Sequence, residues 1–532
     1  MSVGCTTWAM RGKVKRLLLT TIHRPLGITS ETCGPHVVAE MYHAQLTGVQ
    51  GPFSIRSICI GWGLEFLARN LETPTTVLHF PTLSLFIREL KKGYDFVGIA
   101  FVISTFPKAV ELCRIVRREA PGTKIILGSY GTMLPECDQY ADYVCREEGV
   151  GFLKRLLGEG PAGSFQPVVI KRSFKVMSVS TPPAVLIPTG LGCTRGCDFC
   201  ATSHFFHRRY IPLLKTGREL HDAMCSVDFP GTTFRDVGIM DEDFLADRRR
   251  IAEMIPLNAA EVEKPVLFSC LSSLRSLAQY STDELISMGL SGVLIGIESE
   301  QATYAKLAGV DARATFATLR SIGVSIVASM IVGFEWHDEL TIERDFQYLM
   351  SLRPTFSQFM LYTPCPQTPL HRRLKAEGRL YDIPYQFRDG YHLTFRHPHF
   401  SDKRLEQLMS SLMRRDYEEL GPSICRVLEA QLLGWQNLHE SPSPLYRARA
   451  REHKTMCLKI YPLLRHAIGR APGPKARRYL TDLRSKVEDE FRIPSSARVK
   501  ETVVPILSLY TRMKDRLFPN PQPKPIINRY RQ

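Results

Sequence analysis

Hydrophobic residues in the first third of the chain form short runs that alternate with amphipathic stretches. The runs have strand length and are rich in Val, Ile and Phe, whereas apolar residues between them recur with helical spacing. Strands are predicted at residues 55–60, 75–80, 96–104, 124–128 and 143–146, and helices at 64–70, 83–91, 107–119 and 151–157. This alternation predicts an α/β domain with a doubly wound parallel sheet of the flavodoxin or Rossmann type.

A second alternating series follows a stretch with several Pro, Gly and Ser residues. Its predicted strands are residues 184–189, 234–240, 265–270, 292–297, 324–332 and 356–362, with helices at 219–226, 247–258, 283–288, 313–322 and 340–352. Six strands are too few for a complete eight-unit barrel, so a partial (β/α)6 barrel is predicted, with its site at the carboxyl ends of the strands.

Beyond residue 401 the pattern becomes helical, and no strand is predicted there. The expected organisation is an N-terminal extension, a front domain, a linker, a barrel and a helical C-terminal region. Their predicted boundaries are 1–54, 55–160, 161–183, 184–400 and 401–532.

The net charge of +16 is concentrated near the C-terminus, where residues 451–532 hold 19 Lys/Arg against 7 Asp/Glu. A solvated helical face is the ordinary explanation, and contact with anionic lipid, nucleic acid or an acidic partner is the alternative. No uninterrupted apolar run reaches the about 18 residues of a membrane span, and residues 1–16 lack a signal-peptide core and cleavage site. The 14 cysteines lack the dense spacing of a secreted disulfide scaffold, so a cytoplasmic protein is predicted.

Three of the cysteines form a tight group directly after the first strand of the second series. Cys193, Cys197 and Cys200 have the spacing Cys-x3-Cys-x2-Cys, which lets one loop wrap around a cuboidal iron–sulfur cluster. Three thiolates leave one of four irons open to an external ligand. A structural zinc site would need a fourth ligand, which His204 or His207 could supply.

Polar residues and glycines also follow later strands of this series. They are the acidic segment Asp241, Glu242 and Asp243, the pair Glu298 and Ser299, and Gly333. Each has an ordinary structural explanation, since an acidic turn often caps the next helix and an isolated Glu often lies at the surface. Because strand carboxyl ends meet at one edge of such a sheet, they are expected to lie near the cysteine loop.

The cysteine spacing, with Phe199 before the last cysteine, resembles the radical S-adenosylmethionine (SAM) superfamily. The resemblance spans residues 184–380 and includes the segment Tyr-Thr-Pro-Cys-Pro-Gln-Thr-Pro-Leu at 362–370. It implies a [4Fe–4S] cluster on the three cysteines, and cleavage of SAM to a 5′-deoxyadenosyl radical with an electron from a flavodoxin- or ferredoxin-type donor. It further implies SAM contacts from Phe199, the acidic segment, Glu298, Ser299 and Gly333.

A doubly wound domain before such a barrel resembles the cobalamin-binding domain of one branch of this superfamily. The resemblance implies a cobalamin site at the strand ends, with candidate residues Ser104, Gly128, Gly131 and Glu148. The Asp-x-His-x2-Gly signature, which provides a histidine ligand to cobalt elsewhere, is absent. Two explanations of this absence stay open. Either the domain binds cobalamin without that histidine, or it has become a scaffold or a lid.

These features predict a cobalamin-dependent methyltransferase that acts on an unactivated carbon of a small-molecule or lipid-like substrate. A cobalamin-independent cyclisation, oxidation or rearrangement is the alternative reaction, and a non-catalytic protein that binds nucleic acid or membrane is the alternative class. Residues 503–518 combine apolar and basic side chains, as in a helix at a membrane surface. Peripheral membrane contact is therefore predicted as an option, and nucleic-acid binding is not expected.

Overall fold

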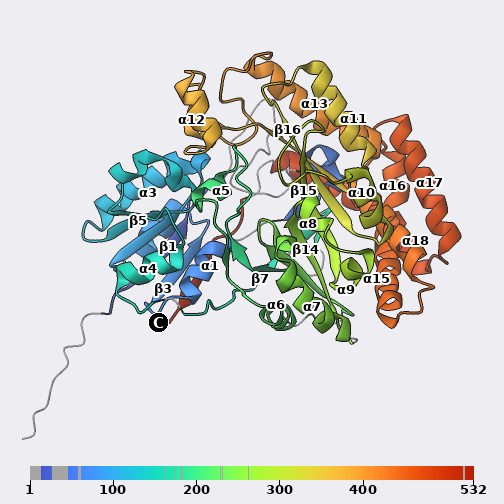
Figure 1. Cartoon of the computed structure of the whole chain (residues 1–532), viewed down its shortest axis with the longest axis horizontal. Helices are drawn as coiled ribbons and strands as arrows, with labels where there is room; N and C mark the ends of the chain where they lie inside the picture. Colours follow the sequence, from blue (N-terminus) through green and yellow to red (C-terminus); the bar gives the residue numbers. More distant parts are fainter. Residues whose placement is uncertain are drawn as a thin grey trace, which may run out of the picture. The chain divides into compact units, whose positions relative to one another are not determined.

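The computed structural model describes residues 14–26, 46–57, 61–161, 163–172, 174–180, 184–227, 229, 232–261, 263–518 and 522–531. The chain divides into two compact units (Figure 1). The first unit contains residues 1–25, 61–166 and 522–532, and the second contains residues 26–60 and 167–521. The first unit therefore draws on both ends of the chain.

The first unit is built on a six-stranded sheet with the order β18-β3-β1-β4-β5-β6. Five strands are parallel: β1 (Leu17–Thr21), β3 (Thr75–His79), β4 (Phe96–Ala100), β5 (Lys124–Gly128) and β6 (Tyr143–Val144). Their helices are α1 (Trp62–Arg69), α2 (Leu83–Leu90), α3 (Phe106–Glu119) and α4 (Gly149–Leu157). In chain order the parallel strands run 2-1-3-4-5, which is the flavodoxin-like doubly wound order with a switch point between β1 and β4.

The first strand of this sheet differs from the predicted one. The segment Leu17–Thr21 forms the central strand, and Leu17 and Leu18 are fully buried because both faces of a central parallel strand are covered. The segment expected at 55–60 contributes only β2 (Arg56–Ser57), which pairs with β8 (Phe174–Val176) in the second unit. Residues 58–60 lie outside the described residues. Residues 17–21 and 55–60 are both short apolar runs, and their local sequence pattern does not show which of them joins the sheet.

A second difference lies near the C-terminus, where the strand β18 (Ile526–Tyr530) pairs antiparallel with β3 and forms the edge of the sheet. No strand was predicted beyond residue 401. The strand is only half buried and its apolar pattern is weak, so its pairing comes from tertiary contacts. Arg529 forms an ion pair with Glu89 at 2.9 Å, and Asn528 donates to Glu65 at 2.7 Å.

The second unit contains the predicted six parallel strands in consecutive order. They are β10 (Ala184–Pro188), β13 (Arg235–Met240), β14 (Val266–Ser272), β15 (Leu290–Glu298), β16 (Ser325–Val332) and β17 (Phe356–Leu361). The strand β7 (Ile170–Arg172) lies antiparallel at one edge, within the segment expected to be a linker. The larger helices after these strands are α6 (Gly217–Cys225), α7 (Arg248–Ala260), α10 (Ala312–Ser321), α11 (Glu339–Ser351) and α12 (Pro369–Ala376).

Six further helices follow the sheet, as the sequence predicts for this region. They are α13 (Asp402–Leu420), α14 (Ser423–Leu438), α15 (Pro444–Ile460), α16 (Pro462–Gly469), α17 (Pro474–Glu490) and α18 (Ser495–Leu517). Several of them share a core that includes Leu428, Tyr461 and Leu480. No helix within the described residues is both long and apolar enough to span a bilayer.

Candidate functional site

The cysteine loop joins β10 to the short helix α5 (Ala201–Phe205) and is folded tightly back on that helix. Ser203 Oγ donates to the carbonyl of Cys193 at 2.8 Å and accepts from the amide of Gly196 at 3.0 Å. Gly192 and Gly196 both have positive φ angles, and a Cβ at Gly192 would lie 2.3 Å from the carbonyl oxygen of Arg209. Glycine is therefore needed where the loop turns, and the three cysteines are held on one curved segment.

The three thiols of this loop are half-buried and form no disulfide. Burial raises the pKa of Cys193 to about 11, and burial also raises the pKa of Cys197 and Cys200. Without a metal they are protonated at neutral pH, since coordination is what ionises a buried thiol. The donor set therefore suits a bound metal cluster better than it suits a free nucleophile.

The spacing of these thiols fits a cluster better than a zinc ion. Tetrahedral zinc would bring thiolates to about 3.8 Å of one another, given Zn–S distances of about 2.3 Å. In the part of the chain that the structure describes, only one group of three potential ligands has its ligand atoms within 4.8 Å of one another, and it does not include these cysteines. His204 Nε2 lies 3.1 Å from the carbonyl oxygen of Cys197, so this ring nitrogen is engaged by the loop backbone. Thiolates on separate irons of a cubane are necessarily further apart.

In the acidic segment after β13, Glu242 is exposed, whereas Asp241 and Asp243 accept hydrogen bonds from neighbouring segments. Asp241 accepts hydrogen bonds from Tyr210 at 2.6 Å and from buried Arg250 at 3.3 Å. Asp243 accepts two hydrogen bonds from Arg195, and three serines of the next loop donate to it as well. Both side chains therefore hold the loops in place.

Glu242 is the exposed member of this segment, and its charge acts on two of the thiols. Its side chain is solvent-accessible, yet surrounding protein desolvates the carboxyl and raises its pKa, with a further contribution from Asp241. Its charge in turn contributes to the raised pKa values of Cys193 and Cys200. Glu242 is therefore an exposed carboxylate beside the cluster loop, and Asp243 also acts on Cys193.

Glu298 ends β15 with a φ of +61° and is almost fully buried. Lys306 donates to its carboxylate, and a Cβ at Gly296 would lie 2.2 Å from Glu298 Oε1, so the glycine leaves room for this side chain. Glu298 raises the pKa of Lys306 although burial opposes it, and Lys306 tends to lower the pKa of Cys197. Ser299 is buried and accepts from the amide of Gln301 at 3.1 Å.

An aromatic group covers the cysteine loop on another side. The ring of Phe199 makes edge contacts with Tyr304 and Tyr362, at centroid distances of 5.4 and 5.9 Å. Both hydroxyl groups donate to the carboxylate of Asp198, at 2.9 and 2.6 Å. Asp198 thus ties the cysteine loop to segments more than 100 residues away, which sequence spacing could not reveal.

Gly333 follows β16 and also lies at the carboxyl edge of the sheet. Its φ is +88°, and a Cβ there would lie 2.6 Å from Leu405 Cδ2. The next residue, Phe334, contacts Tyr362 at a centroid distance of 4.7 Å and extends the aromatic group. The strand ends therefore place Gly333 beside the ring cluster, where the backbone itself requires glycine.

The candidate cobalamin residues lie at strand ends of the first unit, and two have clear local roles. Gly128 ends β5, Ser104 is buried after β4, and Gly131 leaves no room for a Cβ, which would lie 2.2 Å from the Phe101 ring. Glu148 caps α4 by accepting from the amides of Val150 and Gly151 at 2.6 and 2.7 Å.

One histidine that the sequence did not single out follows β1. His23 lies at the switch point of the sheet, with Nδ1 3.0 Å from the carbonyl oxygen of Arg24 and Nε2 3.0 Å from Glu111 Oε2. Both ring nitrogens are therefore occupied by the protein. The strand itself was missed, so its terminal histidine was missed with it.

Two curated proteins resemble parts of this chain in sequence. No family model matches the chain. The chain is 25% identical over 369 residues to bacteriochlorophyllide d C-12(1)-methyltransferase of Chlorobaculum tepidum, which covers 64% of this chain and 78% of that protein. It is also 25% identical over 203 residues to hopanoid C-2 methylase of Rhodopseudomonas palustris, over 36% of this chain and only 37% of that enzyme.

A solved structure extends the comparison to the fold. TsrM from Kitasatospora setae, a radical SAM methyltransferase with cobalamin and a [4Fe–4S] cluster bound, matches with a TM-score of 0.50 at 12% identity. The match covers 84% of this chain and 99% of that one. These relatives agree with the predicted resemblance: TsrM shares the fold of this chain, and the two curated proteins are a methyltransferase and a methylase.

Proposed function

We propose that this protein is a radical SAM methyltransferase that uses cobalamin and acts on an unactivated carbon of a small-molecule or lipid-like substrate. The observation that carries the proposal is the cysteine loop, whose three spread thiols lie beside Glu242 and the Glu298–Lys306 pair. An external low-potential donor of the flavodoxin or ferredoxin type provides the electron. The same site would support a cobalamin-independent radical reaction, which is the second candidate.

The cluster and SAM, when bound, supply a radical able to take hydrogen from carbon that no acidic or basic side chain can activate. Cys193, Cys197 and Cys200 hold the cluster. Glu242 binds the cationic amino group of SAM, because it is the accessible carboxylate next to the thiols. Glu298 accepts from the ribose, with Lys306 fixing its orientation.

Four aromatic side chains form an apolar wall beside the cysteine loop. Phe199, Tyr304, Phe334 and Tyr362 contact one another over the loop, and they exclude water from it. The Asp198 carboxylate accepts from both tyrosines and fixes their hydroxyl groups. Rigid support of this kind holds reacting groups in a productive geometry.

Cobalamin, when bound, supplies the methyl group from the first unit. The carboxyl ends of β1, β4 and β5 form its site, because ligands of doubly wound sheets bind at the switch point. Ser104, Gly128 and Gly131 lie at these ends. His23 is bonded to Arg24 and Glu111, so it would not be available to hold this group.

A lipid-like substrate is favoured by the helix α18, whose exposed face is more apolar than its buried face. The buried side consists of Ala497, Glu501, Val504, Ser508 and Thr511. The exposed side consists of Val499, Val503, Ile506, Leu509, Tyr510, Met513 and Leu517. At about 100° per residue, these apolar residues form one stripe opposite the buried side.

Basic residues flank this stripe on both sides, with Lys500 and Lys514 on one and Arg512 and Arg516 on the other. Polar contacts hold the inner side, where Glu501 lies 3.0 Å from Arg484 and Asp515 pairs with Arg56. An apolar stripe between cations is the pattern of a helix that lies in the headgroup region of an anionic membrane. The proposal therefore includes peripheral membrane contact through α18.

The products of SAM test the proposed function. The protein is reconstituted anaerobically with iron, sulfide and hydroxocobalamin, reduced and incubated with SAM, and the nucleosides are quantified by mass spectrometry. The expected result is 5′-deoxyadenosine together with S-adenosylhomocysteine, neither of which forms with the Cys193→Ala/Cys197→Ala/Cys200→Ala variant. 5′-Deoxyadenosine without corrinoid-dependent S-adenosylhomocysteine would support the second candidate. Absence of both products from a preparation with a full iron complement would overturn the proposal.

A further inference from the structure

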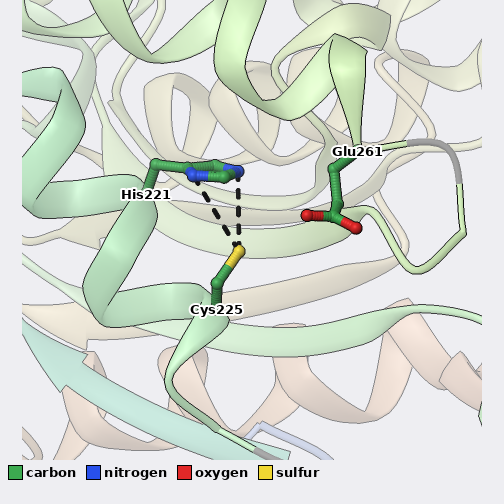
Figure 2. Close-up of side chains that lie close together, drawn as sticks. All are labelled: His221, Cys225 and Glu261. Carbon is green, nitrogen blue, oxygen red and sulfur yellow. Dashed lines mark hydrogen bonds between the residues drawn. The ribbon is translucent and has the colours of Figure 1, made fainter.

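Three side chains with metal-binding atoms meet on the outer helices of the second unit, away from the cysteine loop. They are His221 and Cys225 on α6 and Glu261 directly after α7. Figure 2 shows the imidazole and the thiol facing each other on one helix, with the carboxylate directed toward them from the neighbouring segment. None of these residues has a part in the proposed methyl transfer.

The local structure explains why these three side chains meet. Residues four apart on a helix lie on one face, so His221 and Cys225 are neighbours along α6. The helices α6 and α7 pack against each other (Figure 1), and α7 ends at Ala260. Glu261 therefore reaches the same point from the end of the second helix.

The distances match those of a tetrahedral metal site. His221 Nε2 lies 3.5 Å from Cys225 Sγ, and one ligand atom from each of the three residues lies within 4.8 Å of the others. Zinc bonds of about 2.3 Å to sulfur and 2.0–2.1 Å to nitrogen, at a tetrahedral angle, put the two atoms about 3.5 Å apart. The observed separation of these two atoms, which is also that of a hydrogen bond between them, is compatible with a shared zinc ion.

The chemistry of the three donors also suits zinc. Imidazole, thiolate and carboxylate are its usual protein ligands, and one thiolate with one carboxylate neutralises the ion's two positive charges. Arg235 and Arg218 are nearby cations that oppose binding, and the Arg235 guanidinium donates to the carbonyl of Lys264. Asp222 Oδ1 lies 4.0 Å from His221 Nδ1 and adds a compensating negative charge beside the ring.

The position of the site in the fold indicates what the metal does. Helices after parallel strands run back toward the strands' amino ends, so the last residues of α6 and α7 lie at that edge of the sheet. The cysteine loop, Glu242 and Glu298 follow the carboxyl ends of β10, β13 and β15. A metal here is at the far edge from the proposed chemistry, where residues serve stability.

We propose that His221, Cys225 and Glu261 form a zinc site that joins the ends of α6 and α7, with solvent as the fourth ligand. The ion stabilises the packing of α6 against α7 and takes no part in the reaction. This inference is independent of the proposed methyltransferase function.

Cobalt(II) is the probe for this site, because a thiolate ligand gives tetrahedral cobalt a charge-transfer absorption band. The full chain carrying Cys193→Ala, Cys197→Ala and Cys200→Ala, which removes the cluster ligands, is titrated with cobalt and then with zinc. The expected result is a band that saturates at equimolar cobalt and disappears on addition of zinc. It should vanish with a further Cys225→Ser change and persist with a Cys145→Ser control.

Affinity measurements guard against misfolding of the Cys225 variant. His221→Gln and Glu261→Gln are each expected to weaken cobalt binding by more than about tenfold, since even outer contacts of metal ligands have effects of 10–100-fold. Circular dichroism and the melting temperature without metal should stay unchanged in both. A missing band in the Cys145→Ser control, or equal affinity in the His221 and Glu261 variants, would overturn the zinc site.

Discussion

Arg195, in the middle of the cysteine loop, donates from Nε and Nη2 to one carboxylate oxygen of Asp243, at 2.9 and 2.7 Å. Both side chains are largely withdrawn from solvent. The pair joins the loop after β10 to the loop after β13, and Ser273 and Ser276 complete the network. The loop that carries the cysteines is therefore fixed by a charged contact and not by its own backbone alone.

Replacing this arginine should loosen the cluster site. Arg195→Ala leaves Asp243 partly unpaired, and we expect a local cost of about 1–3 kcal/mol. Arg195→Lys keeps the charge but loses the planar fork, so it should restore only part of the effect. The measurement is the iron retained after anaerobic reconstitution and desalting, with exposed Arg209→Ala as the control. Full iron retention in Arg195→Ala would show that the pair does not support the loop.

The Glu298 carboxylate is predicted to contribute directly to SAM binding. Glu298→Gln keeps the shape but removes a charged acceptor, so the Kd for SAM should rise about tenfold or more, as expected for loss of about 1.5–3 kcal/mol. Glu300→Gln, an exposed position two residues away, is the matched control. Equilibrium binding to the reconstituted protein measures both. An unchanged Kd in Glu298→Gln would remove this residue from the proposed SAM site.

The apolar stripe on α18 should bind membranes. Ile506→Glu/Met513→Glu places two acids in the stripe, and co-sedimentation with phosphatidylserine-containing vesicles should fall at least about tenfold from loss of apolar and electrostatic attraction. Thr481→Glu/Ser485→Glu on exposed positions of α17 makes the same charge change and should bind as the unmodified protein does. Equal binding by both double variants, or none by the unmodified protein at low salt, would contradict membrane docking by this helix.

His453 should make the second unit sensitive to acid. The ring is buried and its Nδ1 lies 2.6 Å from Gln431 Oε1, and burial lowers its pKa to about 3. Because the unfolded chain takes up a proton near pH 6.5, stability is complete above that pH. It falls by about 1.4 kcal/mol per pH unit below it.

The matched comparison is His453→Gln, which keeps a donor toward Gln431. Denaturant unfolding at pH 7 and pH 5 should show about 2 kcal/mol less acid sensitivity in the variant, from the 1.5 units below pH 6.5. Equal sensitivity of the two proteins would mean that His453 is not held neutral in the fold.

The pattern of the sequence predicted the second sheet well because its strands are buried on both faces and read as continuous apolar runs. β1 was missed although it is the central strand of the other sheet, since a run of only five residues gives little local signal. β18 was missed for a different reason. It is an edge strand that depends on pairing with β3, more than 400 residues earlier.

The site was predicted only as far as local motifs extend. The cysteine spacing placed Cys193, Cys197 and Cys200 on one loop, and the strand ends placed Glu298 and Gly333 at the same edge. Contacts that join distant segments were out of reach, including those of Asp198 with Tyr304 and Tyr362 and of Lys306 with Glu298. The sequence also could not show which carboxylates of the acidic segment hydrogen-bond to the protein, because the partners of Asp241 and Asp243 come from other segments.

Cofactor retention tests directly whether the chain binds both an iron–sulfur cluster and cobalamin. The full chain is reconstituted anaerobically with iron, sulfide and hydroxocobalamin, desalted, and analysed for iron and corrinoid beside the Cys193→Ala/Cys197→Ala/Cys200→Ala variant. We expect about four irons and about one corrinoid per chain, with only the iron lost in the variant. Iron that remains when the three cysteines are removed, or no corrinoid in the fully loaded protein, would contradict it.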